Sequence, residues 1–339
     1  MILLFALASS RPDTRGLLNS FWILASGFWL LVFVFLFSSC APRQPGEQAK
    51  ETRITAASGV RLRSEPAESA GEITRLGVGT VLRVVEQSSN WYRVSTPDGK
   101  EGWVFGGHTA AFEAADRDSI YRKIADDRLK VEDATFADLV DLARFLTAAS
   151  SEVEDREAKA ELELARLLAI KRALDEIPVQ KQQERQYAAW VESLEDEVVY
   201  NEPAGQWLVR SDLFWDLQER YKDLAIAERI AWEGADNPLP GECEGYFPCY
   251  LAYFNRTKGK YLELYPAGAH AEEAIAEIAE SLEETRATME GAPSPDPDER
   301  AEARKELLQL RETVGKASGE KKADLLKHVD EYLKYYGVA

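Results

Sequence analysis

Hydrophobic and polar positions alternate along short runs between residues 52 and 112. In residues 59–64, Val60 and Leu62 take one side of an extended chain, while Arg61 and Arg63 take the other. Similar runs, rich in β-branched and aromatic residues, are separated by Gly, Pro and Asp, which favour turns. The pattern predicts five strands, at residues 59–64, 72–76, 79–85, 91–95 and 102–104. Five short strands can bury a common face only by curling into a small barrel or sandwich.

From Phe112 onward, apolar residues recur at intervals of three and four, which is typical of helices. Five such stripes stand out, and each must be buried against neighbouring helices. Their members are Phe136, Leu139, Val140, Ala143 and Leu146; Leu164, Leu167, Leu168 and Leu174; Phe214, Leu217, Tyr221 and Leu224; Ala271, Ile275, Ile278 and Leu282; and Leu326, Val329, Leu333 and Tyr336. The stripes predict an all-α bundle or solenoid.

A weak internal repeat lies within this helical region. Residues 221–228 can be laid on residues 265–272 at a spacing of 44, each with an aromatic helix end, a turn, and Ala-Glu opening the next helix. These junctions, most clearly residues 261–266, resemble those of tetratricopeptide-like proteins, although standard repeats are about 34 residues long. A plain irregular helical bundle is an equal alternative.

Four motifs in residues 52–112 follow the order and spacing of a bacterial SH3 domain. They are VRLRSEP at residues 60–66, GTV at 79–81, NWYRV at 90–94 and DGKEGWV at 98–104. The segment therefore resembles that family, whose members are extracytoplasmic recognition modules, several of which bind cell-wall peptides through an aromatic-lined groove. The resemblance implies Trp91, Tyr92 and Trp103 as ligand-binding candidates. The alternative is that these residues form barrel core, and at least one of the adjacent Trp91 and Tyr92 should do so.

The first forty residues carry an apolar run from Leu17 to Phe37 that ends at Ser38, Ser39 and Cys40. Residues 36–40 resemble a bacterial lipoprotein signal, although Phe37 stands where such signals usually have Leu. The resemblance implies lipidation at Cys40 and a lipid-anchored protein of the cell envelope. An uncleaved membrane helix is the alternative, because 21 apolar-rich residues can span a bilayer. Both readings place the rest of the chain outside the cytoplasm.

The expected fold is multidomain α+β, with a small SH3-like β-barrel followed by a larger all-α bundle or solenoid. The expected parts are a signal peptide (1–39), a tether rich in Pro and polar residues (40–51), the bacterial SH3-like domain (52–112), a helical, tetratricopeptide-like domain (113–290), a linker (291–298) and C-terminal helices (299–339). The formal net charge of −18 is unevenly shared: 50 acidic and 30 basic residues follow from Glu113, whereas residues 52–112 are near neutral. An acidic surface repels phosphate backbones, which argues against nucleic-acid binding.

The two cysteines that remain if Cys40 is lipidated are Cys243 and Cys249. In an oxidising compartment, such an isolated pair is most simply a disulfide. A redox-active or metal-binding pair is the alternative, but the spacing is not CxxC and no His is near.

No constellation of catalytic residues is evident. Peptidoglycan hydrolases that accompany such β modules need a Cys with His partners, or a metal held by His and carboxylates. Here His108, His270 and His328 lie far apart, and neither a phosphate-binding loop nor a Gly-x-Ser-x-Gly motif occurs. The sequence predicts a non-enzymatic protein without metal or cofactor, which binds peptidoglycan peptides or envelope proteins. A purely structural scaffold and a cryptic peptidoglycan hydrolase are the alternatives.

Overall fold

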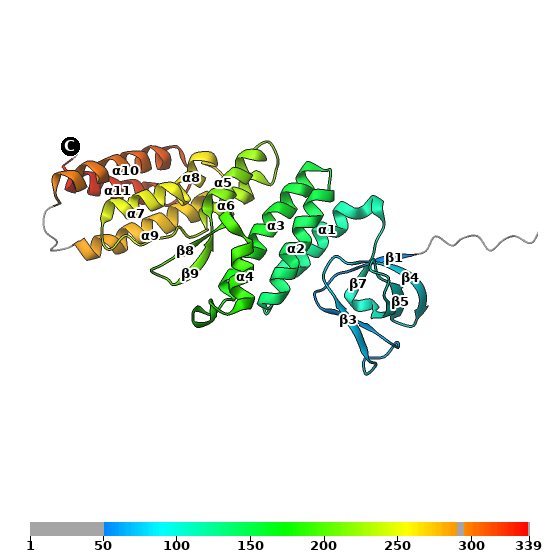
Figure 1. Cartoon of the computed structure of the whole chain (residues 1–339). Helices are drawn as coiled ribbons and strands as arrows, with labels where there is room; N and C mark the ends of the chain where they lie inside the picture. The colour runs from blue at the N-terminus through cyan, green and yellow to red at the C-terminus, as the bar shows by residue number, and fades with distance from the viewer. Residues whose placement is uncertain (1–50, 290–294, 338–339) are drawn as a thin grey trace, which may run out of the picture. The chain divides into compact units, whose positions relative to one another are not determined.

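The computed structural model describes residues 51–289 and 295–337, which belong to one compact unit (Figure 1). The predicted signal peptide, Cys40 and nearly all of the predicted tether lie outside these residues. Along the described chain, an antiparallel sheet is followed by a region made mainly of helices. This is the multidomain α+β class that the sequence predicts. None of the helices in residues 51–289 and 295–337 combines the length and apolar character needed to cross a membrane.

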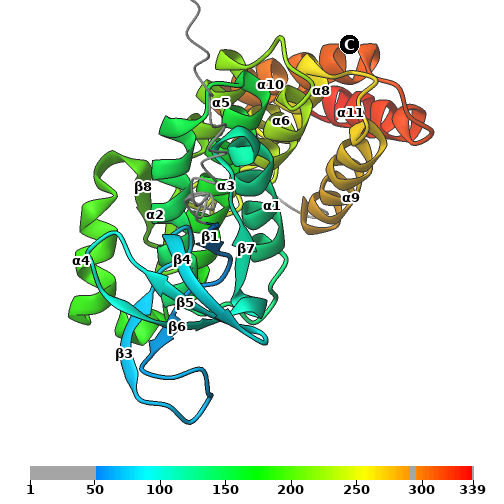
Figure 2. The same cartoon turned by 90° about the vertical axis from the view of Figure 1, so that its right-hand side faces the viewer.

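The β module, residues 52–112, contains seven described strands, two more than predicted. They are β1 (Thr52–Thr55), β2 (Val60–Arg63), β3 (Glu72–Leu76), β4 (Val81–Ser88), β5 (Trp91–Ser95), β6 (Glu101–Phe105) and β7 (Thr109–Ala111). The strand order is β3-β2-β6-β5-β4-β1-β7, and Figure 2 shows β4, β5 and β6 as neighbours. The extra strands β1 and β7 are only three or four residues long and pair with each other across the module. Such non-local pairing leaves little signal in the local sequence.

The core of the β module comes from alternating positions of five strands. The alternation predicted in residues 59–64 is confirmed, because Val60 and Leu62 are buried while Arg61 is exposed. The buried cluster consists of Val60, Leu62, Leu76, Leu82, Val94 and Val104. Consequently the side chains at the intervening positions of β2, β5 and β6 are left on the outer face of the sheet.

The described helical region contains eleven α-helices. They are α1 (Arg117–Leu129), α2 (Phe136–Glu152), α3 (Arg156–Asp175), α4 (Arg185–Ser193), α5 (Ser211–Arg220), α6 (Ala227–Ala235), α7 (Phe247–Arg256), α8 (Lys258–Leu264), α9 (Ala271–Met289), α10 (Pro297–Lys316) and α11 (Lys322–Tyr335). Short 3-10 turns occur at Gly106–His108, Ala114–Asp116, Val179–Lys181 and Glu195–Glu197. Helix α10 begins inside the linker predicted at residues 291–298, because Asp296 caps its first turn.

One hairpin interrupts the region that the sequence predicts to be entirely helical. Strands β8 (Val198–Asn201) and β9 (Gln206–Val209) pair around a turn in which Gly205 has a φ of +64°. Valine and aromatic residues on both sides of a Pro- and Gly-containing turn favour a hairpin over a helix. The two junctions of the weak repeat are both short helix-to-helix turns, α5 to α6 and α8 to α9. The resemblance to tetratricopeptide proteins itself stays a prediction.

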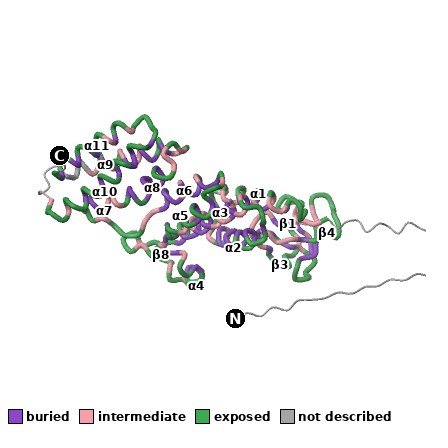
Figure 3. The backbone as a smooth tube through the Cα atoms, turned by 90° about the horizontal axis from the view of Figure 1, so that it is seen from above, coloured by how far each residue is buried: buried purple, intermediate pink, exposed green. Residues whose placement is uncertain are grey.

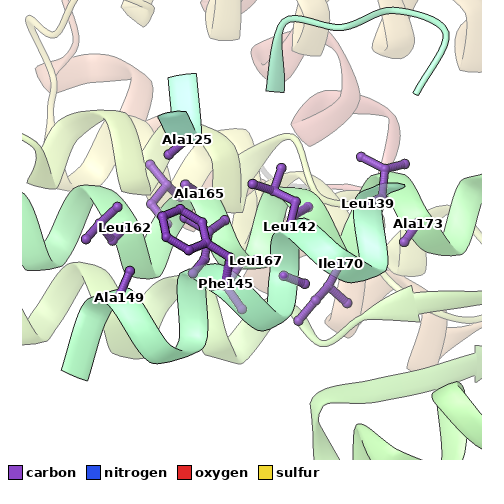
Figure 4. Close-up of a cluster of buried hydrophobic side chains, with 14 of the residues drawn as sticks. Ala125, Leu139, Leu142, Phe145, Ala149, Leu162, Ala165, Leu167, Ile170 and Ala173 are labelled. Carbon is purple, nitrogen blue, oxygen red and sulfur yellow. The ribbon is translucent and has the colours of Figure 1, made fainter. Parts of the chain in front are cut away.

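The predicted helical stripes face two hydrophobic clusters, which divide within α6. Ile230 belongs to the first cluster and Ala231 to the second. Helices α2 and α3 supply much of the first cluster, as Figure 4 shows for Leu142, Phe145 and Leu162. The second cluster extends from α6 to α11. Figure 3 shows how buried and exposed positions alternate along helices such as α10 and α11.

The β module contacts α2 through the turn between β3 and β4. The backbone N–H of Val78 donates a hydrogen bond to Asp141 Oδ2 over 2.8 Å, and Val78 belongs to the first helical cluster. Gly79 has a φ of +80°, and a Cβ at this position would collide with the ring of Phe145. The close approach therefore requires glycine here.

The predicted disulfide between Cys243 and Cys249 is present in the structure. It spans a separation of six residues and closes the loop that leads into α7. The bridge therefore fixes a local turn.

Candidate ligand-binding pocket of the β module

A pocket of about 400 Å³ opens on the β module, and we call it the aromatic pocket. Its aromatic residues are Trp91 on β5, Phe105 on β6 and His108 in the turn that follows β6. Its charged residues are Arg61 and Arg63 on β2 and Glu68 in the loop before β3; residues 57–60 complete the lining. This combination of flat rings with both signs of charge suits a small ligand that has apolar and ionic groups.

The aromatic residues are brought together by the register between β5 and β6. Trp91 lies directly opposite Phe105, so both side chains share the outer face of the sheet. Their rings meet edge to face at a centroid separation of 5.5 Å, and Phe105 meets His108 in the same manner at 5.6 Å. These contacts fix the ring of Phe105 between its two neighbours. A ligand would therefore meet an ordered aromatic surface that loses little rotamer entropy on binding.

The charged residues of the pocket differ in how strongly they already interact with other residues of the chain. Arg63 donates a hydrogen bond to the carbonyl of Ala70 over 2.8 Å, which ties the loop before β3 to the sheet. Arg61 lies 3.3 Å from Glu72, and both of these side chains are exposed. Such exposed ion pairs contribute little stability, so a ligand carboxylate can compete for Arg61. Glu68 makes no hydrogen bond or ion pair within the described residues and can accept a ligand ammonium group.

The three predicted ligand-binding residues occupy three different environments. Trp91 lines the aromatic pocket. Tyr92 lies on the other face of β5, packs against the barrel core, and has the guanidinium of Arg53 at 4.0 Å from its ring centre. Trp103 shares the outer face with Trp91 but is not among the residues that line the pocket. The expectation that Trp91 and Tyr92 point to opposite faces is confirmed.

The pocket residues that were not predicted from the sequence include the aromatic residues Phe105 and His108 and the charged residues Arg61, Arg63 and Glu68. The alternation of β6 could have placed Phe105 on the same face as Trp103, two residues before it. Its contact with Trp91, however, depends on the register of two strands, and His108 depends on the turn at Gly106–His108. The structure also finds no group of three His, Cys, Asp or Glu side chains in residues 51–289 and 295–337 that could hold a metal ion.

The chain combines a small SH3-like β module with a helical region. Residues 58–110 match the family model of the bacterial SH3 domain, which confirms the resemblance seen in the sequence. The match covers less than one-sixth of the 339 residues and describes this segment alone. A domain of this kind suggests a module that binds cell-wall material or proteins. A search of curated proteins found no relative of the chain.

Proposed function

We propose that the β module binds peptidoglycan peptides through the aromatic pocket, with Trp91 as the central contact. The observation that carries this proposal is the pocket itself, where Trp91, Phe105 and His108 meet Arg61 and Glu68 within about 400 Å³. Cell-wall peptides carry carboxylates, amines and short aliphatic side chains. Arg61 suits the carboxylates, Glu68 suits an amine, and the rings suit the aliphatic groups.

The same proposal assigns the protein to the cell envelope as a lipoprotein anchored through Cys40. Its support is the apolar run that ends directly at Cys40 and the Pro-rich polar segment that follows. An anchor and tether of this kind would hold the β module near the wall. Incorporation of a labelled acyl chain, with and without an inhibitor of the lipoprotein signal peptidase, tests this part. Cys40→Ala should abolish the label, and label retained in that variant would contradict the anchor.

The helical region serves, in this proposal, to bind envelope proteins, and no catalytic step is assigned to the chain. Its acidic surface suits an aqueous envelope space better than contact with anionic polymers. Purified sacculi incubated with the protein should keep their turbidity. Clearing of the sacculi would instead support a peptidoglycan hydrolase.

Wall binding is tested by co-sedimentation of residues 49–339 with purified sacculi. Two tryptophans on the same sheet face provide a matched pair, because Trp91 lines the pocket and Trp103 does not. Trp91→Ala should weaken retention at least about tenfold, since a buried aromatic contact is commonly a binding hot spot. Trp103→Ala should bind much as the wild type does. If the wild type does not bind sacculi, the proposal of wall recognition is rejected and a purely structural scaffold is favoured.

A further inference from the structure

A second cavity, of about 410 Å³, lies in the helical region among α1, α3 and α6. Contacts near both ends of α3 show that the three helices run in the same direction. Arg122 near the start of α1 pairs with Glu161 near the start of α3, and Arg172 near the end of α3 donates to the carbonyl of Leu129 at the end of α1. For α6, the backbone N–H of Ile226 just before the helix donates to Glu157 at the start of α3, and Lys171 near the end of α3 donates to the carbonyl of Asp236 after α6. Helix α3 therefore forms the floor of what we call the α3 groove.

The floor of the α3 groove is aliphatic. Leu162, Ala165 and Leu168 follow one side of α3, and Ala125 and Leu129 of α1 continue the apolar surface. Figure 4 shows Ala125, Leu162 and Ala165 close to one another. No aromatic side chain is among the lining residues, so the groove offers no ring on which a sugar or a base could stack. An aliphatic side chain is the group that this floor accommodates best.

Most of the basic residues that line the α3 groove already donate to acceptors of this chain. These contacts join Arg122 to Glu161 (3.2 Å), Lys130 to Asp126 (2.5 Å), Arg172 to the carbonyls of Leu129 (2.6 Å) and Val131 (2.7 Å), and Lys171 to the carbonyl of Asp236 (3.4 Å). Arg229 is the lining basic residue for which no such hydrogen bond or ion pair is found among the described residues. Arg172 and Lys171 keep their positive charge in these contacts, because their acceptors are neutral carbonyls, so the lining is close to electrically balanced, with five basic and four acidic side chains.

Glu233 is an acidic lining residue without a direct partner among the described residues. Its side chain is half-buried on α6 and forms no hydrogen bond or ion pair within the described part of the chain. Arg229 stands one turn earlier on α6, but this order of charges is the weaker one at that spacing, and the two side chains do not pair. Burial raises the pKa of the Glu233 carboxyl, although Arg229 and Lys171 oppose the effect. An unpaired, partly desolvated carboxylate gains most from a cation brought by a ligand.

The wider charge distribution also favours a cationic ligand. The chain from Glu113 onward contains 50 acidic and 30 basic residues, so the field around the helical region attracts cations. Asp175, at the far end of the α3 groove, is a second carboxylate without a hydrogen bond or ion pair in residues 51–289 and 295–337. Glu233 and Asp175 are thus the two lining carboxylates, and Arg229 the one lining cation, without such a contact in the described part of the chain.

We propose that the α3 groove binds an extended segment of a partner protein in which a Lys or Arg stands next to an aliphatic residue. The cationic group pairs with Glu233, and the aliphatic side chain packs on Leu129 and Leu168, which are only partly buried. The lining positions of α1 extend from Arg122 to Lys130, a length of about 12 Å at 1.5 Å per residue. This length holds about three to four residues of an extended chain. The site lies apart from the aromatic pocket and does not depend on the function proposed for it.

The probe for this proposal is a blocked, fluorescent six-residue peptide in which Leu and Lys alternate. Fluorescence anisotropy measures its binding to residues 49–339, which form a compact unit. Saturable binding is expected with a Kd below about 1 mM. A peptide with Glu in place of Lys, and one with Ser in place of Leu, should each bind at least about tenfold more weakly.

Two isosteric variants distinguish a direct ion pair with Glu233 from general attraction of the peptide to the acidic surface. Glu233→Gln should weaken binding of the Leu-Lys peptide about tenfold, as expected for loss of a charged hydrogen bond. Glu280→Gln removes the same charge from an exposed position on α9, outside the groove, and should change the Kd less than twofold. Equal weakening by the two variants, tighter binding of the Glu peptide, or no saturation by about 1 mM would overturn the proposal.

Discussion

The contact between the β module and α2 makes a quantitative prediction about Asp141. Its carboxylate accepts the hydrogen bond from the Val78 backbone over 2.8 Å, and Val78 is only 8% exposed. Asp141→Ala removes the acceptor and leaves this amide without a protein partner. A hydrogen bond to a charged group is worth about 1.5–3 kcal/mol, but Asp141 is half-exposed and water can replace part of it. We therefore expect a loss of about 1–2 kcal/mol at this contact.

Native-state hydrogen exchange of the Val78 amide measures this loss locally. A change of 1–2 kcal/mol corresponds to exchange that is about 5- to 30-fold faster. Asp141→Asn keeps an acceptor oxygen and should fall between the wild type and Asp141→Ala. Asp127→Ala is the control, because Asp127 is exposed on α1 and pairs only with Lys123 four residues earlier, a contact worth less than about 0.5 kcal/mol. Val78 exchange in Asp141→Ala within twofold of the wild type would refute the reasoning.

Three further predictions concern stability. Leu162→Ala, at a fully buried position, should lower the free energy of unfolding by about 2–5 kcal/mol, whereas Leu308→Ala, at a position 43% exposed, should lower it by less than about 1 kcal/mol in urea unfolding. The double variant Cys243→Ser, Cys249→Ser should have a free energy of unfolding lower by about 2 kcal/mol, a modest loss because the loop that the disulfide closes is short. The reduced wild type should melt at the same temperature as this double variant. Burial raises the pKa of Glu233 in the folded state above its ordinary 4.5, so the folded state loses stability as the pH rises above 4.5. Glu233→Gln should therefore be more stable than the wild type at pH 7.5 and no more stable than it at pH 4. A variant that is more stable than the wild type only at pH 4 would contradict this.

The order of the elements could be predicted from the sequence because the patterns that define them are local. The alternation at Val60 and Leu62 and the stripe from Ala271 to Leu282 each predict a buried face, and both faces are buried. Strands β1 and β7 were missed because each is very short and pairs with a partner more than fifty residues away. The β8–β9 hairpin was missed although its Val and Trp residues and its turn carry a strand pattern.

The candidate site was predictable only in part. The family motifs indicated Trp91, which lines the aromatic pocket; its role in ligand binding stays a prediction. They did not separate it from Tyr92, whose face of β5 packs on the core, or from Trp103, which shares the outer face but lies outside the lining. Phe105 joins Trp91 through strand register, and Glu233 joins the α3 groove through the packing of three helices. Register and helix packing are tertiary properties that a single sequence does not display locally.

Whether the aromatic pocket binds cell-wall peptides can be read from the indole N–H signals of Trp91 and Trp103 in a heteronuclear NMR titration. Soluble peptide fragments from digested peptidoglycan are added to residues 49–339. Because Trp91 lines the pocket and Trp103 lies outside it on the same sheet face, the two signals serve as probe and internal control. Binding in the aromatic pocket should give a saturable shift of the Trp91 signal with little change at Trp103. A Trp91 signal that stays unmoved at saturating fragment concentration would contradict it.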